Sequence, residues 1–338
     1  MLPPSSDCGG VTALQPAPAL SLLAIAYSNG LLIIRDVQAD KTIIELNSGQ
    51  LRRSRIDSIS FRTDGLGAGD DGRRAGVMAT AGTDTGDVTL WDLNDRGRVM
   101  GVLRGAHNPP SAVGGRVSGG INKVEFLPGQ PIIVTSGLDN AIKSWIFDET
   151  PYSAIPQILH SLSGHAAQVK KLHFLPVNSD GADASGKWLL SAGGDRSLWA
   201  WSLRRDGQST ELSQGNVRKK AKKMGLLGAA SQTTTLEVLK APEITCIATS
   251  LNRDGGMGAK AGSGGAVWTN SAGDGKGGTG DASSSAATGW ESVITGHRGD
   301  RFARTWFWGR KKAGRWAFEV GDGGEVMVCN LFSFWRHG

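Results

Sequence analysis

The sequence predicts an all-β fold of the propeller class, built from one four-stranded unit that is used several times. An aspartate stands six residues before a tryptophan at three places, Asp139/Trp145, Asp195/Trp201 and Asp300/Trp306. Trp91 and Arg35 mark the equivalent position in two earlier units, so that the landmarks of the first four units lie 54 to 56 residues apart. A fixed period of this kind indicates a repeated structural unit.

The apolar runs of each unit account for its expected strands. In the first unit, two short strands flank Asn29-Gly30, which is a strong hairpin signal. The second unit predicts strands at Ile56–Phe61, Val77–Ala81 and Asp87–Leu93. The third predicts them at Ile121–Phe126, Ile132–Ser136, Ala141–Phe147 and Gln157–Leu162. The fourth predicts them at Val169–Phe174, Trp188–Ala192, Ser197–Leu203 and Thr235–Leu239. Four strands are the content of one propeller blade.

The fifth unit is interrupted by residues 253–289, which are nearly all small or polar and bury too little apolar surface to order. The predicted organisation is a disordered N-terminus (1–10), blades one to four (11–203), a basic insertion within the fourth blade (204–234), the end of the fourth and start of the fifth blade (235–252), a Gly/Ser-rich disordered insertion (253–289), the rest of the fifth blade (290–326) and an atypical tail (327–338). With about five blades or part-blades, we expect an incomplete propeller that is an internal fragment of a larger tandem-propeller protein.

Composition limits the class of protein. The 338 residues are 39% hydrophobic and 20% charged, which permits a packed core, and the 49 glycines indicate many turns. The three cysteines have neither metal-site nor disulfide spacing. No secretory signal and no run of about 18 apolar residues is present. We therefore expect a soluble intracellular protein with no metal and no membrane contact.

The positive charge is local. Residues 204–223 carry a net charge of +5 and residues 297–316 carry +6, while the whole chain carries +6. The rest of the chain is therefore acidic overall. Such clustering either favours a phosphate-bearing partner or marks two solvated loops.

Two sets of polar residues repeat from blade to blade and could suggest a hydrolase. They are His107, Thr135, Asp139 and Trp145 in the third unit, and His165, Ser191, Asp195 and Trp201 in the fourth. Ser191 lies inside an apolar strand, whereas a catalytic serine must be exposed. The repetition favours a buried hydrogen-bond chain that fastens each blade, and no catalytic residue is predicted. In the second unit Thr85 and Ala81 occupy the aspartate and hydroxyl positions, so we expect its network to be absent or rearranged.

Two cationic groups are candidate binding residues. The first interleaves with aromatic residues, as in single-stranded RNA sites, and comprises Arg301, Arg304, Arg310, Lys311, Lys312 and Arg315. Its alternative is a hairpin with tryptophans in the core and solvated arginines, so contact with RNA or a partner stays open. The second is a nuclear-import signal or a charged loop and comprises Arg218, Lys219, Lys220, Lys222 and Lys223.

The Gly-His…Gly-x-Asp…Trp frame resembles WD-repeat proteins. Longer strings are more specific: Ile59–Gly65, Gly86–Leu93, Leu103–Pro110, Ser136–Asn140, Ser163–Ala167, Leu172–Pro176 and Thr305–Trp308. In this order they resemble the U3 small nucleolar RNA-associated protein 21 family, also called the WD-repeat protein 36 family, from about Val11 to Val326.

The resemblance implies a non-enzymatic scaffold of the small-subunit processome, acting in pre-rRNA processing and 18S rRNA maturation in the nucleolus. Its expected partners are other WD-repeat processome proteins, U3 small nucleolar RNA and pre-rRNA, contacted directly or indirectly. No cofactor and no small-molecule substrate are expected. The alternative is a generic WD-repeat adaptor, either a ubiquitin-ligase substrate receptor or a chromatin-linked scaffold.

Overall fold

The fold is taken from a computed structural model. It describes residues 9–17, 21–47, 54–64, 76–113, 116–147, 155–174, 188–203, 207, 209–213, 217–225, 239–249, 293–307 and 312–319. The expected disordered insertion and the expected C-terminal tail lie outside these residues, as do residues 1–8 of the expected disordered N-terminus. The chain forms two compact units, Met1–Lys170 and Lys171–Gly338.

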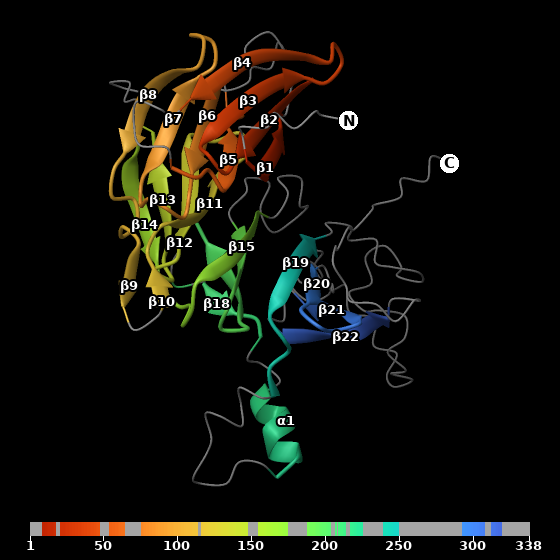
Figure 1. Ribbon diagram of the computed structural model, residues 1–338. Coiled ribbons are helices and arrows are strands. Elements are labelled where there is room, and N and C mark those ends of the chain that lie inside the picture. The colour runs from red at the N-terminus through yellow and green to blue at the C-terminus, as the bar shows by residue number, and fades with distance from the viewer. Residues whose placement is uncertain are drawn as a thin grey trace, which may run out of the picture. The chain divides into compact units, whose positions relative to one another are not determined.

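The first unit contains three four-stranded sheets, each with its strands in chain order (red to yellow-green in Figure 1). The first sheet is β1 (Val11–Pro16), β2 (Leu22–Tyr27), β3 (Leu31–Asp36) and β4 (Lys41–Asn47). The second is β5 (Ser58–Phe61), β6 (Val77–Ala81), β7 (Val88–Asp92) and β8 (Arg98–Leu103). The third is β11 (Ile121–Phe126), β12 (Ile132–Gly137), β13 (Ile142–Ile146) and β14 (Gln157–Leu162). A small hairpin, β9 (Ser111–Val113) and β10 (Arg116–Ser118), precedes the third sheet.

The local sequence explains the β2–β3 hairpin. Gly30 has a φ of 83°, a conformation that glycine adopts without steric cost. Its N–H donates to the Tyr27 carbonyl at 3.0 Å, and the Leu31 N–H donates to the Asn29 side chain at 3.0 Å. Asn-Gly therefore closes this hairpin as predicted.

Alternate residues of the sheets in the first unit form two apolar cores. Leu32, Ile34 and Trp91 belong to a cluster that joins the first and second sheets. Leu90 and Trp145 belong to a second cluster that joins the second and third sheets. The second sheet thus buries one face against the first sheet and the other against the third, which is the packing of a propeller blade.

Hydroxyl groups join the first strands of the second and third sheets. The Val124 N–H donates to Ser58 Oγ at 3.0 Å, and the Phe126 N–H donates to Ser60 Oγ at 2.9 Å. The Gly129 N–H donates to Thr63 Oγ1 at 3.0 Å. Ser58 and Ser60 are buried, so these bonds satisfy polar groups that water cannot reach. We call this set the hydroxyl ladder.

The second unit contains most of the fourth sheet and all of the fifth. The fourth is β15 (Val169–Phe174), β16 (Trp188–Gly193), β17 (Leu198–Ser202) and β18 (Thr210–Glu211), and the unit boundary falls within β15. The fifth is β19 (Ile244–Thr249), β20 (Val293–His297), β21 (Phe302–Phe307) and β22 (Lys312–Glu319). Leu190, Leu198, Ile244 and Trp306 share one apolar core.

The all-β propeller prediction is confirmed, with five four-stranded sheets among the described residues. Two details differ from the sequence expectation. The outer strand of the fourth sheet is β18 rather than Thr235–Leu239, most of which lies outside the described residues. The basic run, for which the sequence left open a nuclear-import signal or a charged loop, forms a short helix, α1 (Val217–Lys223). Neither the two-residue β18 nor the mostly cationic α1 has the apolar periodicity by which strands and helices are recognised in a sequence.

Candidate functional site

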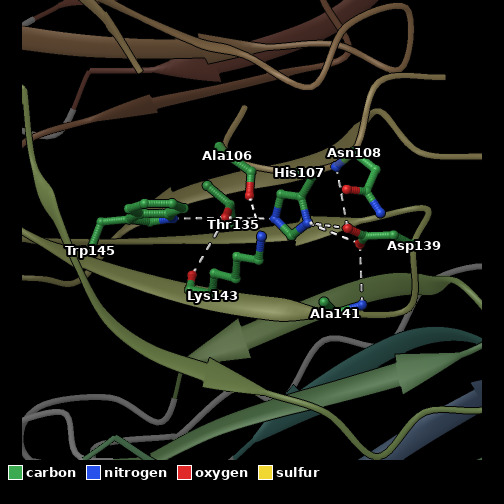
Figure 2. Close-up of polar contacts among 8 residues, drawn as sticks. All are labelled: Ala106, His107, Asn108, Thr135, Asp139, Ala141, Lys143 and Trp145. Carbon is green, nitrogen blue, oxygen red and sulfur yellow. Dashed lines mark hydrogen bonds and ion pairs between the residues drawn. The ribbon is translucent and has the colours of Figure 1, made fainter. Parts of the chain in front are cut away.

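The third blade contains a continuous polar network (Figure 2). The Trp145 indole N–H donates to Thr135 Oγ1 at 3.0 Å. Thr135 Oγ1 lies 2.8 Å from His107 Nε2, and His107 Nδ1 lies 2.9 Å from Asp139 Oδ1. The Ala141 N–H donates to the same carboxylate oxygen at 3.3 Å, so the turn after β12 holds the far end of the network.

The carboxylate sets the proton positions. An ionised carboxylate only accepts hydrogen bonds, so Nδ1 of His107 carries a hydrogen, and in the neutral ring Nε2 accepts from the Thr135 hydroxyl. Burial alone would raise the pKa of Asp139. The His107 hydrogen bond and charge, with the Ala141 and Asn108 N–H groups, outweigh burial and lower that pKa.

This geometry does not suit nucleophilic catalysis. Thr135 has an exposed fraction of 0%, as has Ser191 in the fourth blade. A hydroxyl that attacks a substrate must be able to touch it. The hydroxyls of these two blades are therefore not placed as nucleophiles.

The fourth blade contains the corresponding tryptophan–hydroxyl bond. The Trp201 N–H donates to Ser191 Oγ at 2.6 Å. At the following turn, Asp195 Oδ1 accepts from the Ser197 N–H at 3.1 Å. His165 is buried, and its role in this network stays a prediction.

The fifth blade contains a network that the sequence interpretation missed. The Trp306 N–H donates to Thr295 Oγ1 at 2.7 Å, and that oxygen lies 2.9 Å from His297 Nε2. His297 Nδ1 lies 2.7 Å from the Pro242 carbonyl oxygen and not beside an aspartate. Asp300 instead accepts from Arg304 Nη2 at 2.6 Å.

The strand register explains this substitution. In the third blade the first residue of β11, Ile121, pairs with Gly137. In the fifth blade the first residue of β19, Ile244, pairs with His297. A Cβ atom at Gly137 would lie 2.3 Å from His107 Nδ1. The third blade therefore needs glycine where the fifth has its histidine, because the ring of His107 occupies that space.

The second blade also contains a polar network, but with different residues. The Trp91 N–H donates to Thr80 Oγ1 at 2.8 Å, so the prediction that Ala81 holds the hydroxyl position was wrong by one residue. Among the described residues, no histidine side chain bonds to the Trp91–Thr80 pair. Asp57 Oδ2 instead accepts from the Thr83 hydroxyl at 2.7 Å, and Arg55 Nε lies 2.5 Å from Asp57 Oδ1.

Comparison with known proteins identifies the family. Residues 3–148 match the family model described as WDR36/Utp21 first beta-propeller. The chain is 32% identical over 336 residues to U3 small nucleolar RNA-associated protein 21 of Saccharomyces cerevisiae, covering 96% of this chain and 28% of that protein. The Schizosaccharomyces pombe homologue is 32% identical over 321 residues, covering 95% of this chain and 27% of that protein. The chain belongs to the WDR36/Utp21 family. The predicted resemblance is thereby confirmed.

This WDR36/Utp21-family chain spans less than a third of the length of those two relatives. Among solved structures, a chain of a mitotic checkpoint complex crystal structure aligns with a TM-score of 0.55 and 14% identity. The alignment covers 96% of this chain and 69% of that chain. At this identity the likeness shows the propeller fold alone.

The aromatic–cationic segment of this family member is partly described. Arg301 pairs with Glu319 at 3.1 Å, and Arg304 pairs with Asp300, while Trp306 lies in the apolar core. Lys312 and Arg315 belong to β22, and Arg310 and Lys311 lie outside the described residues. Contact of these six cations with RNA or a partner stays a prediction.

The second cationic group lies on α1. Its members are Arg218, Lys219, Lys220, Lys222 and Lys223. Lys222 and Lys223 are exposed, and Ala221 between the cations is buried. The predicted role in nuclear import is not tested by this geometry.

Two further findings concern cofactors and membranes. In the described part of the chain, no group of three or more His, Cys, Asp or Glu side chains could hold a metal ion. No helix within that part is long and apolar enough to cross a membrane.

Proposed function

We propose that this chain is a non-enzymatic WD-repeat scaffold that works with the U3 small nucleolar ribonucleoprotein in pre-rRNA processing and 18S rRNA maturation. The observation that carries the proposal is the 32% identity, over 96% of the chain, to a protein named for its association with U3 small nucleolar RNA. The proposed site of action is the small-subunit processome in the nucleolus.

The polar networks support a scaffold role. Their hydroxyls are buried, so they stabilise blades and leave the exposed turns and outer strands for partners. The proposed partners are other WD-repeat processome proteins, U3 RNA and pre-rRNA. The cationic residues at 297–316 and on α1 give RNA a complementary charge.

The proposal is tested by purification of the tagged full-length chain from its own cells. We expect enrichment of U3 RNA and pre-rRNA over an unrelated small nucleolar RNA, measured by quantitative reverse transcription. Depletion of the protein should cause unprocessed small-subunit precursors to accumulate. Enrichment of ubiquitin-ligase subunits or chromatin proteins without U3 RNA would overturn the proposal in favour of a generic WD-repeat adaptor.

A further inference from the structure

Two cationic groups on the second unit differ in how their charges are balanced. Arg298, Arg301 and Arg304 have side-chain exposed fractions of 66%, 58% and 41%, yet each faces a carboxylate. Their partners are Glu243 at 3.5 Å, Glu319 at 3.1 Å and Asp300 at 2.6 Å. Each of these three arginines therefore has its charge balanced by a nearby carboxylate.

Helix α1 is different. Five of its seven residues are cationic, and its first turn contains no acidic residue. Lys222 and Lys223 are exposed, and neither forms an ion pair with another described residue. The charges of these two lysines are therefore uncompensated among the described residues, unlike those of the three arginines on the fifth blade.

Helical periodicity places these cations on one side. With about 3.6 residues per turn, Arg218, Lys219, Lys222 and Lys223 fall within an arc of about 140°. Ala221, with an exposed fraction of 0%, and the half-buried Val217 lie on the opposite side. The helix thus buries Ala221 on its small apolar side and exposes Lys222 and Lys223.

The local sequence specifies the helix despite the repulsion among its charges. Lys222 and Lys223 lie in the last turn, where the helix dipole favours positive charge. Gly225, with a φ of 68°, follows the end of the helix, and its N–H donates to the Lys222 carbonyl at 3.2 Å. Like charges four residues apart still cost about 0.2–0.5 kcal/mol per pair, so a bound polyanion would relieve strain in α1.

We infer that α1 binds the phosphate backbone of RNA. A phosphate backbone can bind a compact cationic surface whose side chains are not held in one conformation. The binding affinity comes from the counterions that the RNA releases. The inference rests on the proposed function. That function includes contact with RNA, either directly or through other proteins, and the inference is that one of these contacts is direct. It assigns that contact to α1 rather than to the paired arginines of the fifth blade.

The test uses the purified full-length chain and a fluorescent oligouridylate, with binding followed by anisotropy at rising KCl concentration. The test variant is Lys222→Ala/Lys223→Ala, and the matched control is Arg298→Ala/Arg301→Ala. We expect the test variant to bind roughly tenfold more weakly near physiological salt, with a slope of log affinity against log salt smaller by about 1.4. The control should stay within about twofold, because its arginines already face carboxylates.

Hydrogen exchange gives a second readout. The peptide that spans α1 should become protected when the oligouridylate is added to the wild-type chain, whereas peptides from β21 should not. Unchanged affinity in the test variant, or an equal loss in the control, would overturn the inference. Unchanged RNA affinity together with loss of nuclear accumulation in cells would instead assign α1 to an import receptor.

The failure of this inference is distinguishable from failure of the proposed function. If U3 RNA co-purifies with the wild-type chain while the test variant binds the probe as tightly as wild type, the function stands and the inference falls. If probe binding depends on α1 but U3 RNA does not co-purify, the inference stands and the function falls.

Discussion

In the third blade the histidine of the polar network comes from the connector before the sheet, whereas in the fifth blade it comes from the strand itself. His107 bridges a hydroxyl to Asp139, but His297 bridges a hydroxyl to a backbone carbonyl. The aspartate of the fifth blade pairs with Arg304. The tryptophan–hydroxyl bond is therefore the common part, and the source of the histidine can vary.

The largest effect is expected where the two blades agree. Trp145→Ala and Trp306→Ala each remove a buried indole and leave a buried threonine hydroxyl short of a partner, which should cost about 3–5 kcal/mol. Hydrogen exchange with mass spectrometry would locate the loss. Each variant should lose protection mainly in its own sheet. Equal loss throughout the chain would show that the blades do not respond separately.

The next largest effect is the coupling between histidine and aspartate, which should differ between the third and fifth blades. In a double-mutant cycle, His107→Ala and Asp139→Ala should show a coupling free energy of about 1–2 kcal/mol, because the two side chains are in direct contact. His297→Ala and Asp300→Ala should couple by less than about 0.5 kcal/mol, since each bonds to another group. Urea unfolding measures both cycles. Equal couplings would contradict the difference between the networks.

The pH dependence should differ in the same way. Burial is the main cause that lowers the pKa of His297 from 6.5, so the unfolded chain binds this proton more readily. Stability of the fifth blade should therefore fall as pH drops from 6.5 towards the lower folded pKa. Asp139 has a pKa lowered from 3.8 by its partners, so its contribution should be lost only below pH 3.8. Hydrogen exchange at several pH values, with His297→Gln as control, would test this order.

The smallest effect is expected at the exposed cation. Arg304→Ala removes the partner of Asp300, but the Arg304 side chain is 41% exposed and the Phe302 N–H still donates to the carboxylate. The expected loss is about 0.5 kcal/mol or less, measured by urea unfolding. A decrease in the free energy of unfolding as large as that of His107→Ala would mean that the Arg304–Asp300 pair, and not His297, stabilises the fifth blade.

The same networks show how far the sequence determines this structure. Strand positions followed from apolar runs, and in the third and fourth blades the tryptophan–hydroxyl bond joins residues ten positions apart, as the sequence predicted. In the second and fifth blades the turn is longer and this separation is eleven, so Thr80 and Thr295 were missed. The role of His297 depends on strand register, which the sequence does not display without the paired strand.

The candidate binding residues were found from their charge and, in the first group, from the interleaved aromatic residues, but their ion-pair partners were not found. Glu319 lies eighteen residues after Arg301, and Glu243 lies 55 residues before Arg298. Such ion pairs depend on tertiary contacts. The sequence could therefore locate the two cationic groups but could not show that Arg298, Arg301 and Arg304 are paired while Lys222 and Lys223 are not.

The hydroxyl ladder has a consequence for the order in which the chain folds. In the first three sheets neighbouring strands pair over short separations along the chain, so each of these blades can form from local contacts. The ladder bonds of Ser58, Ser60 and Thr63 each span 66 residues and require two blades to be in place. Contacts of long sequence separation form slowly because a large loop must close first. Single blades are thus the early folding units, and the ladder sets their alignment late.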